Sequence, residues 1–337
     1  MTGLAVDLGT GRTRAADSSG RLVLDEPSAA AVDLRDGSLV AFGASALDLP
    51  GRSAGQVRLV RPVVHGQLQD LGLTDQVVAH VMTRARRAVG RHPEVLCTVP
   101  GLASGVQRRA LQRAFTRAGA ARVEFIQHAV AAGIGLRLEI GEPVASMVVD
   151  VGAGTLDASV IALGGVVTEA SLPLGGNDLD LAVREACLRT HDLVVSLATA
   201  EELKVAIGAA SPGPESKMEV TGRDASNGAV RTVVVSTSDV AAAISDGVSA
   251  MIAAAVRCIV EAPPDLANDL LSEGLHLAGE GSLLAGFSRR LASATGVPVH
   301  LPESPGRAAV LGAARCLRDL SAVSGARGLA GGGRARS

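Results

Sequence analysis

Two short segments of this sequence place an aspartate directly before a loop of glycine and threonine. Asp7 ends the apolar run 4–7, and Asp150 ends the apolar run 146–150. The loop residues that follow them are Gly9, Thr10, Gly11, Gly152, Gly154 and Thr155. Glycine lets backbone N–H groups approach a phosphate closely, and threonine hydroxyls add donors. Because Mg²⁺ keeps most of its waters and is bound through one or two carboxylates, Asp7 and Asp150 are predicted to hold a magnesium ion.

One aspartate with a glycine loop is weak evidence, because such a segment is most often only a tight turn. Here the pattern occurs twice, about half a chain apart, which favours an internal duplication with one copy in each of two domains. Two such loops that face each other across a cleft predict a specific phosphate site. In the structural alternative, each aspartate only caps its turn by accepting backbone N–H groups.

The pattern around these loops predicts the elements that hold them. Each loop is expected in a β-hairpin, with a second strand at 21–24 in the first copy and at 158–163 in the second. Between the copies, residues 74–138 alternate helix and strand, which is typical of a mostly parallel sheet. The expected elements there are helices at 74–90 with Thr74 as the N-cap, 104–118 and 128–138, and strands at 95–99 and 122–126.

The second half is expected to contain more helices than the first. The expected elements are helices at 178–190, 199–207, 238–261, 282–295 and 305–320, and strands at 275–278 and 297–301. Short strands in 29–66 and the turn-rich segment 211–236 predict a small accessory lobe in each half. From residue 321 to residue 337 the chain is mostly Gly, Ala, Arg and Ser, and we expect a disordered tail.

Length and composition exclude several classes of protein. A chain of 337 residues suits two domains of roughly 150 residues each. Hydrophobic residues make up 47%, but the longest apolar runs fall short of the ~20 residues that span a bilayer, so no membrane span is expected. The start leaves no room for a signal peptide, and we expect a cytoplasmic protein. A net charge of −2 and 1% aromatic residues do not fit a nucleic-acid surface.

The four cysteines have no paired spacing that would indicate zinc, a redox dithiol or a disulfide framework. They are Cys97, Cys187, Cys258 and Cys316. We expect them to be buried and to behave as small apolar side chains.

The order and spacing of several motifs resemble the actin-like ATPases, and within them the MreB family. The segment 6–10 resembles the first phosphate loop of that family, and 148–155 resembles the second. The segment 200–204 is similar to the helix that reaches the ribose and adenine, and 279–284 resembles the adenosine loop. The similarity extends over about residues 4–318.

This resemblance implies an α/β fold of the actin-like class, with two RNase H-like domains around a nucleotide cleft and a small accessory lobe on each. Domain I would comprise 1–143 and 302–320, with its lobe at about 29–70. Domain II would comprise 144–301, with its lobe at about 181–237. The resemblance also implies ATP and Mg²⁺ as ligands, self-association into filaments and partners in cell-wall morphogenesis. Besides the loop residues, the implied nucleotide contacts are Arg14, Glu201, Lys204, Gly279, Glu280 and Gly281.

The sequence departs from the family at the residues implied in hydrolysis. His128 stands where the family has a glutamate that directs the attacking water. A neutral imidazole can also orient a water, so His128 and Asp150 are the candidate catalytic residues of what is at most a slow ATPase. Alternatively, His128 only caps its helix. In the second loop, Ala153 replaces a glycine and adds a methyl near the phosphates, and Leu156 replaces a threonine and removes a hydroxyl.

Glu280 replaces the middle glycine of the adenosine loop. A carboxylate ~5 Å from a phosphate charge costs roughly 3 kcal/mol at an effective dielectric near 20, or about two decades of affinity. Arg12 and Arg14 in the first loop are candidates to offset this charge, because a guanidinium binds phosphate as a fork. The alternative is that both arginines are solvated strand residues.

Membrane contact and the class of function leave further alternatives. The basic segment 84–93 stands where the family has an apolar anchoring loop, and offers at most weak peripheral contact with anionic lipid, at ~1 kcal/mol per basic residue. A nucleotide-free pseudo-actin that acts as an interaction scaffold is the main competing function. A small-molecule kinase would need a sugar pocket, for which there is no large second insertion. A chaperone ATPase would need a substrate domain after residue 320.

Overall fold

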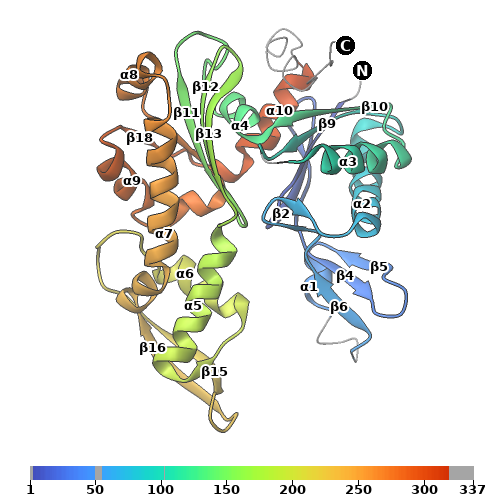
Figure 1. The fold of residues 1–337 in the computed structure, drawn as a ribbon. Coiled ribbons are helices and arrows are strands. Elements are labelled where there is room, and N and C mark those ends of the chain that lie inside the picture. Colours follow the sequence, from blue (N-terminus) through green and yellow to red (C-terminus); the bar gives the residue numbers. More distant parts are fainter. Residues whose placement is uncertain (1–2, 50–54, 102, 319–337) are drawn as a thin grey trace.

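Two five-stranded sheets of the same topology form the upper part of the molecule (Figure 1). The computed structural model describes residues 3–49, 55–101 and 103–318, and the predicted tail at 321–337 lies outside them. The strand order is β10-β9-β1-β2-β3 in the first sheet and β13-β12-β11-β17-β18 in the second. In each sheet, three strands form an antiparallel meander and two further strands run parallel to its first strand. The predicted parallel arrangement of the strands at 95–99 and 122–126 is confirmed, since β9 runs parallel to β1 and β10 runs parallel to β9. The sheet is mixed because β2 runs antiparallel to its neighbours β1 and β3.

The strands of the first sheet are β1 (Gly3–Leu8), β2 (Arg12–Asp17), β3 (Leu22–Pro27), β9 (Glu94–Val99) and β10 (Arg122–Gln127). Those of the second are β11 (Ser146–Val151), β12 (Leu156–Ala162), β13 (Gly165–Leu172), β17 (Leu275–Ala278) and β18 (Val299–His300). The strand predicted at 21–24 is the third strand of the first meander rather than the second. The antiparallel partner of β1 is β2. This strand combines charged residues with Thr13 and alanines, so it has no apolar run that would predict a strand. Strand β13 was also missed, because its residues are half exposed.

The first sheet is covered by helices on both faces, which explains why β1 is apolar from Gly3 to Val6. Leu4 and Val6 pack in a core cluster with α2 (Leu71–Val89) and α3 (Gly105–Arg117). Ala5 packs on the opposite face, against α4 (His128–Gly135) and α10 (Ala308–Arg318). Helix α2 begins one turn before the predicted Thr74, because the Asp70 carboxylate accepts a hydrogen bond from the backbone N–H of Leu73 at 2.6 Å.

The helices of the second half form the other large core. They are α5 (Gly176–His191), α6 (Leu197–Ile207), α7 (Thr237–Val260), α8 (Pro264–Glu273) and α9 (Phe287–Thr295), with short 3₁₀ turns η1 (Glu280–Leu283) and η2 (Pro305–Arg307). The single helix predicted at 282–295 is divided: η1 ends at Leu283, and Gly286, whose φ of 76° is not helical, is the N-cap of α9. The helix predicted from residue 305 begins with η2, and α8 was not predicted.

By length and composition alone, α7 is one helix among the described residues that could cross a bilayer. The sequence predicted this helix at 238–261, but the search for apolar runs did not identify it as long and apolar enough to span a bilayer. Its side chains Val240, Ile244, Val248 and Met251 belong to the buried core beneath the second sheet. The predicted burial of the four cysteines is confirmed, and none of the four forms a disulfide.

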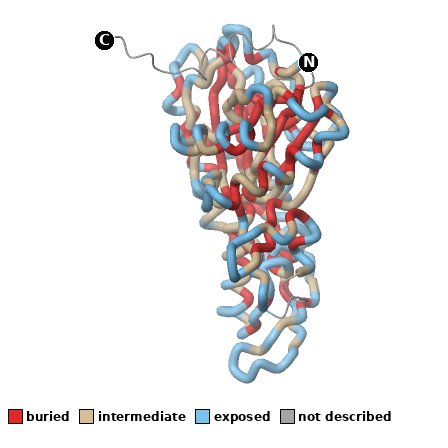
Figure 2. Tube along the Cα trace, turned by 90° about the vertical axis from the view of Figure 1, so that its right-hand side faces the viewer, coloured by how far each residue is buried: buried red, intermediate tan, exposed pale blue. Residues whose placement is uncertain are grey.

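Two small three-stranded sheets lie below the large ones in Figure 1, one in each half. The first contains β4 (Ala30–Asp33), β5 (Leu39–Phe42) and β6 (Val57–Val60), beside α1 (Ala44–Leu47). The second contains β14 (Leu193–Val194), β15 (Lys217–Asp224) and β16 (Val230–Ser236). A two-stranded hairpin, β7 (Val63–Val64) and β8 (Gln67–Leu68), follows the first small sheet. Burial is concentrated around the large sheets, and the lower part of the molecule is mostly exposed or intermediate (Figure 2).

Candidate functional site

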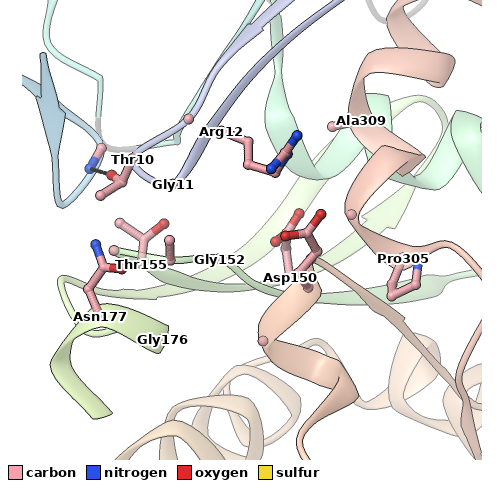
Figure 3. Close-up of a pocket in the computed structure, with 18 of the residues that line it drawn as sticks. Thr10, Gly11, Arg12, Asp150, Gly152, Thr155, Gly176, Asn177, Pro305 and Ala309 are labelled. Atoms are coloured by element: carbon pink, nitrogen blue, oxygen red, sulfur yellow. Dashed lines mark hydrogen bonds between the residues drawn. The ribbon is translucent and has the colours of Figure 1, made fainter. Parts of the chain in front are cut away.

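A cavity of about 450 Å³ lies between the two aspartate hairpins (Figure 3). Its volume is in the usual range for small-molecule sites. Every site residue predicted from the sequence lines it. These are Asp7, Gly9, Thr10, Gly11, Arg14, His128, Asp150, Gly152, Gly154, Thr155, Glu201, Lys204, Gly279, Glu280 and Gly281. Residues far apart in the chain are thus brought to one place, at the ends of β1 and β11.

The two glycine loops face each other across this cavity. Figure 3 shows Thr10 and Gly11 of the first loop opposite Gly152 and Thr155 of the second. Each loop is closed by its own backbone: the N–H of Gly9 donates to Arg12 O at 3.0 Å, and the N–H of Gly152 donates to Thr155 O at 2.8 Å. A methyl group on Gly11 would lie only 2.6 Å from the Cβ of Ala153, so the loops are in close contact.

The β7–β8 hairpin holds both loops in place. Nη1 of Arg61 donates to Thr10 O at 3.1 Å, and the backbone N–H of Gly66 donates to Thr10 Oγ1 at 3.3 Å. Nδ1 of His65 lies 2.8 Å from Gly154 O in the other loop. Sequence interpretation missed this hairpin, because its strands have two residues each and carry no periodic signal.

His128 lies between the two aspartates. Its Nε2 is 2.8 Å from Asp150 Oδ2, and its Nδ1 is 3.6 Å from Asp7 Oδ1. Burial lowers the pKa of His128, but the nearby charges of Asp150 and Asp7 raise it more, to about 10. The ring is therefore an imidazolium in this arrangement. Since the sequence interpretation assumed a neutral imidazole, a water-positioning role for His128 stays a prediction.

Asp157 is a third carboxylate beside this cluster, and sequence interpretation missed it. It lines the cavity from β12, directly opposite Asp150 in the antiparallel register. Burial raises the pKa of Asp157, although the hydroxyl of Ser171 donates to its Oδ1 at 2.5 Å and lowers it in part. The available signal was an aspartate inside an otherwise buried apolar strand.

Other lining residues were not predicted as site residues. They include Gly66, Thr98, Pro100, Asn177, Asp180, Pro305, Gly306 and Ala309. Thr98 has a clear part in the site, since its Oγ1 donates to Asp7 Oδ1 at 2.8 Å. Leu156 does not line the cavity, and its fully buried side chain belongs to the core of the second half.

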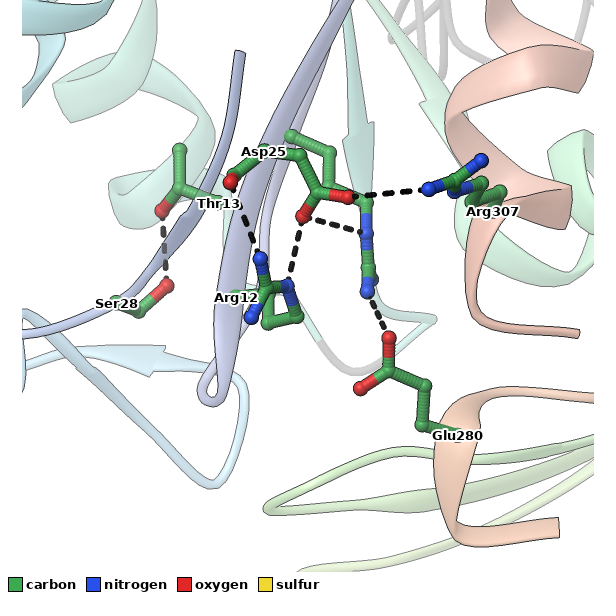
Figure 4. Close-up of polar contacts among 7 residues, drawn as sticks. Arg12, Thr13, Asp25, Ser28, Glu280 and Arg307 are labelled. Carbon is green, nitrogen blue, oxygen red and sulfur yellow. Dashed lines mark hydrogen bonds and ion pairs between the residues drawn. The ribbon is translucent and has the colours of Figure 1, made fainter. Parts of the chain in front are cut away.

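Glu280 reaches across the cavity and pairs with Arg14. Figure 4 shows Glu280 beside Asp25, Arg12 and Arg307 of the same charged cluster. The Arg14 side chain is only 8% exposed, and its Nε lies 3.2 Å from Asp25 Oδ1. Asp25 also accepts from Arg12 Nε at 2.7 Å, and Arg307 Nη2 lies 3.9 Å away. The alternative of two solvated arginines is wrong for Arg14. The earlier repulsion estimate assumed an unpaired Glu280, whereas the structure pairs this carboxylate with a guanidinium.

On the opposite wall, α6 contributes Glu201 and Lys204 to the cavity lining. Nζ of Lys204 lies 2.6 Å from Asp180 Oδ1 and donates to Gly176 O at 3.0 Å. Burial raises the pKa of Asp180, while the contact with Lys204 lowers it in part. Lys204 thus ties the start of α5 to α6 and keeps a cation at the edge of the cavity.

A magnesium ion needs carboxylate oxygens with room around them for its waters. Within the described part of the chain, no group of three or more His, Cys, Asp and Glu side chains could hold a metal ion unaided. A Mg²⁺ site of the hydrated kind needs only one or two carboxylates, with waters and phosphates as the other ligands. Asp7 and Asp150 supply the two carboxylates, but the His128 ring lies between them, with one nitrogen 3.6 Å from Asp7 Oδ1 and the other 2.8 Å from Asp150 Oδ2.

The paired mixed sheets and the cavity between their hairpins define an actin-like fold, which confirms the predicted fold class. Structural similarity supports this. A crystal structure of MreB5 of Spiroplasma citri bound to AMPPNP matches with a TM-score of 0.88 and 25% identity, over 94% of this chain and 96% of the other. A MamK double helical filament matches with a TM-score of 0.76 and 20% identity, over 94% and 99% of the two chains.

Sequence comparison gives the family. The MreB/Mbl protein family model matches residues 1–325. The cell shape-determining protein MreB of Escherichia coli K12 is 33% identical over 329 residues, covering 96% of this chain and 95% of that protein. The cell shape-determining protein Mbl of Bacillus subtilis is 30% identical over 304 residues, covering 90% and 91%. The chain belongs to the MreB/Mbl family.

Proposed function

We propose that this chain is an ATP-binding bacterial actin homologue that self-associates into filaments in the cytoplasm and serves cell shape or cell-wall morphogenesis. One observation carries the proposal: two glycine loops that follow duplicated strands face each other across a nucleotide-sized cavity. The similar MreB5 structure is described as bound to AMPPNP, and MamK as a double helical filament. The curated relatives are described as cell shape-determining.

The proposal assigns roles to the residues around the cavity. Domain I is residues 1–143 with 302–320, and domain II is residues 144–301. The glycine loops bind the phosphates through backbone N–H groups and threonine hydroxyls. Asp7 and Asp150 are the residues that would hold Mg²⁺, which would neutralise phosphate charge when bound. Arg14 contributes charge to the phosphates, while Glu201, Lys204 and the segment 279–281 contact the nucleoside.

Hydrolysis is slow at most in this proposal. Both nitrogens of the His128 ring face carboxylates, so no ring lone pair is available to accept a proton from water. Leu156 supplies no hydroxyl and is buried in the core. The chain then acts mainly by assembly, with ATP as a structural ligand.

A nucleotide-free scaffold is the second candidate function. It is favoured by the ion pairs that satisfy the cavity's charges without a ligand: Arg14 with Glu280, and His128 with Asp150. A ligand must compete with these pairs.

Calorimetry of the purified chain with ATP separates the two candidates. Intrinsic fluorescence is unsuitable, because the sequence has no Trp and no Tyr. We expect a dissociation constant below about 1 mM, and loss of binding in Gly154→Val, whose new Cβ would lie 2.7 Å from Thr10 Oγ1. Gly141→Ala is the matched control, because a Cβ there meets no atom within 4 Å.

Assembly is tested separately by sedimentation and electron microscopy with and without ATP. Filaments that need ATP support the full proposal. Filaments without any detectable ATP binding at millimolar concentration would establish the scaffold function instead.

A further inference from the structure

The position of His128 suggests a property beyond nucleotide binding itself. His128 is the first residue of α4 and follows directly on β10, so its ring enters the cavity from the sheet edge where β1 also ends. The ring lies between the carboxylates of Asp7 and Asp150, with nitrogen to oxygen distances of 3.6 Å and 2.8 Å. Each carboxylate therefore has one oxygen already facing a ring nitrogen.

The side chains of Asp7, His128 and Asp150 form a carboxylate–imidazole–carboxylate bridge, and all three are held by their surroundings. Asp7 and Asp150 are buried, and Asp7 Oδ1 also accepts the hydroxyl of Thr98 at 2.8 Å. Asp150 Oδ1 is pressed against the backbone at Gly279, where an added Cβ would lie only 2.5 Å from it. Helix α4, which carries His128, is packed tightly along α10, since a Cβ on Gly135 would lie 1.9 Å from Ala308 O. The bridge is thus part of the packed structure.

Magnesium requires conditions that this bridge opposes. Mg²⁺ demands near-octahedral oxygen ligands at about 2.0–2.1 Å and keeps several waters, so it needs free carboxylate oxygens and the space between them. A histidine ring tethered to the chain is always present there at high effective concentration. A divalent ion has to displace the ring to reach both aspartates.

We propose that His128 takes the position between Asp7 and Asp150 that a hydrated magnesium ion would occupy, so that nucleotide binding by this chain depends little on divalent cations. This inference rests on the proposed nucleotide binding. Positive charge near the phosphates comes from the chain itself. The cluster of Arg12, Arg14 and Arg307 with Asp25 and Glu280 has three guanidinium groups for two carboxylates.

The test compares the affinity for ADP in excess Mg²⁺ and in excess EDTA by calorimetry, at one constant pH. We expect the dissociation constant of the parent chain to change less than about threefold between the two conditions. In His128→Ala the two aspartates are free to bind the ion, and Mg²⁺ should tighten ADP binding by roughly tenfold or more. His92→Ala is the control, because this exposed histidine lies against Gly119 O and does not line the cavity.

A second readout does not depend on the folding of a variant. Mn²⁺ titrated into the ADP complex of the parent chain and followed by electron paramagnetic resonance should remain largely free. Tight Mn²⁺ binding, a tenfold loss of ADP affinity in EDTA, or a folded His128→Ala without any gain from Mg²⁺ would each overturn the inference while nucleotide binding stands. Absence of ADP and ATP binding in every condition would overturn the proposed nucleotide function together with it.

Discussion

A single histidine is surrounded by three buried carboxylates at the centre of the cavity. Asp7 and Asp150 contact the His128 ring directly, and Asp157 adds a further charge from the neighbouring strand. Buried carboxylates that are close together repel one another, and an imidazolium between them reduces that repulsion. His128 therefore stabilises the empty cavity, whatever its part in ligand binding.

The stability of the chain should fall as pH rises from about 6.5 toward 9, in the absence of nucleotide and divalent cations. The pKa of His128 in the folded state, about 10, lies above its ordinary value of 6.5. Its stabilising contribution is complete below pH 6.5 and is lost as pH approaches 10, with a slope of at most ~1.4 kcal/mol per pH unit. Urea unfolding at a series of pH values measures this slope.

His128→Gln provides the comparison for that experiment, and the fall in stability above pH 6.5 should be largely absent from its profile. The other titrating groups are common to both proteins, so the difference between the two profiles isolates His128. Burial and the neighbouring His300 lower the pKa of His276 to about 4, so this residue acts below pH 6.5. Burial raises the pKa of the Cys97 thiol above its ordinary 9.0. Parallel profiles for parent and variant would contradict the role of His128.

The aspartates and glycines that line the cavity were predictable from the sequence, but the ion pairs among the lining side chains were not. The aspartates and glycine loops were found because each follows an apolar strand, a local pattern that the chain repeats. Which carboxylate pairs with which cation depends on residues brought together from distant segments. Glu280 and Arg14 are 266 positions apart, and no local pattern joins them. Asp157 was overlooked for a similar reason, since its partners Ser171 and Asp150 lie on other strands.

At the scale of elements, the two hairpin loops must fit each other before they can bind phosphate. The closest approach is between Gly11 and Ala153, where one loop has no side chain and the other has a methyl. A glycine at residue 153, as the family has, would leave more space there. The methyl of Ala153, which the sequence placed near the phosphates, therefore also affects how closely the two loops can approach each other. Helices with strong periodicity, such as α2, α3 and α7, were predicted to within a few residues. The contact between the two loops could not be predicted, because it depends on how distant segments are brought together in the fold.

Gly11→Ala should weaken ATP binding by roughly tenfold or more, because its new Cβ would lie 2.6 Å from the Cβ of Ala153 and force the loops apart. The double variant Gly11→Ala with Ala153→Gly should bind within about threefold of the parent, because the clash is removed. Calorimetry on the parent, both single variants and the double variant measures the coupling. Additive effects in this cycle would show that the two loops do not constrain each other.

Arg14 of β2 and Glu280 of η1 form an ion pair across the cavity, and this pair leads to a second prediction. Glu280→Gln should tighten ATP binding by about tenfold, because it frees the guanidinium of Arg14 for phosphate. This gain is smaller than the two decades estimated from the sequence, since the parent carboxylate is already paired and 57% exposed. In an Arg14→Gln background the gain should be less than about twofold. An equal gain in both backgrounds would mean that Glu280 acts on the nucleotide directly.

At the scale of the whole molecule, α4 and α10 lie between the two large sheets and join them. One core cluster contains Ala5 and Leu96 of the first sheet, Val148 and Ile161 of the second, and the inner faces of both helices. In Figure 1 these helices stand between the two large sheets. Because α4 begins with His128, the packing of this helix pair also fixes the bridge between the aspartates. A displacement of α4 along α10 would therefore alter both the angle between the halves and the site.

Gly312→Ala should destabilise the chain by roughly 2 kcal/mol or more and weaken ADP binding, because its Cβ would lie 1.7 Å from Ala131 O and push α4 away from α10. The backbone oxygen cannot move aside as a flexible side chain would. Gly141→Ala serves as the matched control, with an expected change within about 0.5 kcal/mol, since no atom lies within 4 Å of its Cβ. Urea unfolding measures stability, and calorimetry with ADP measures the effect on the site. If Gly312→Ala lost stability but bound ADP like the parent, α4 would not be the element that couples the join between the sheets to the cavity.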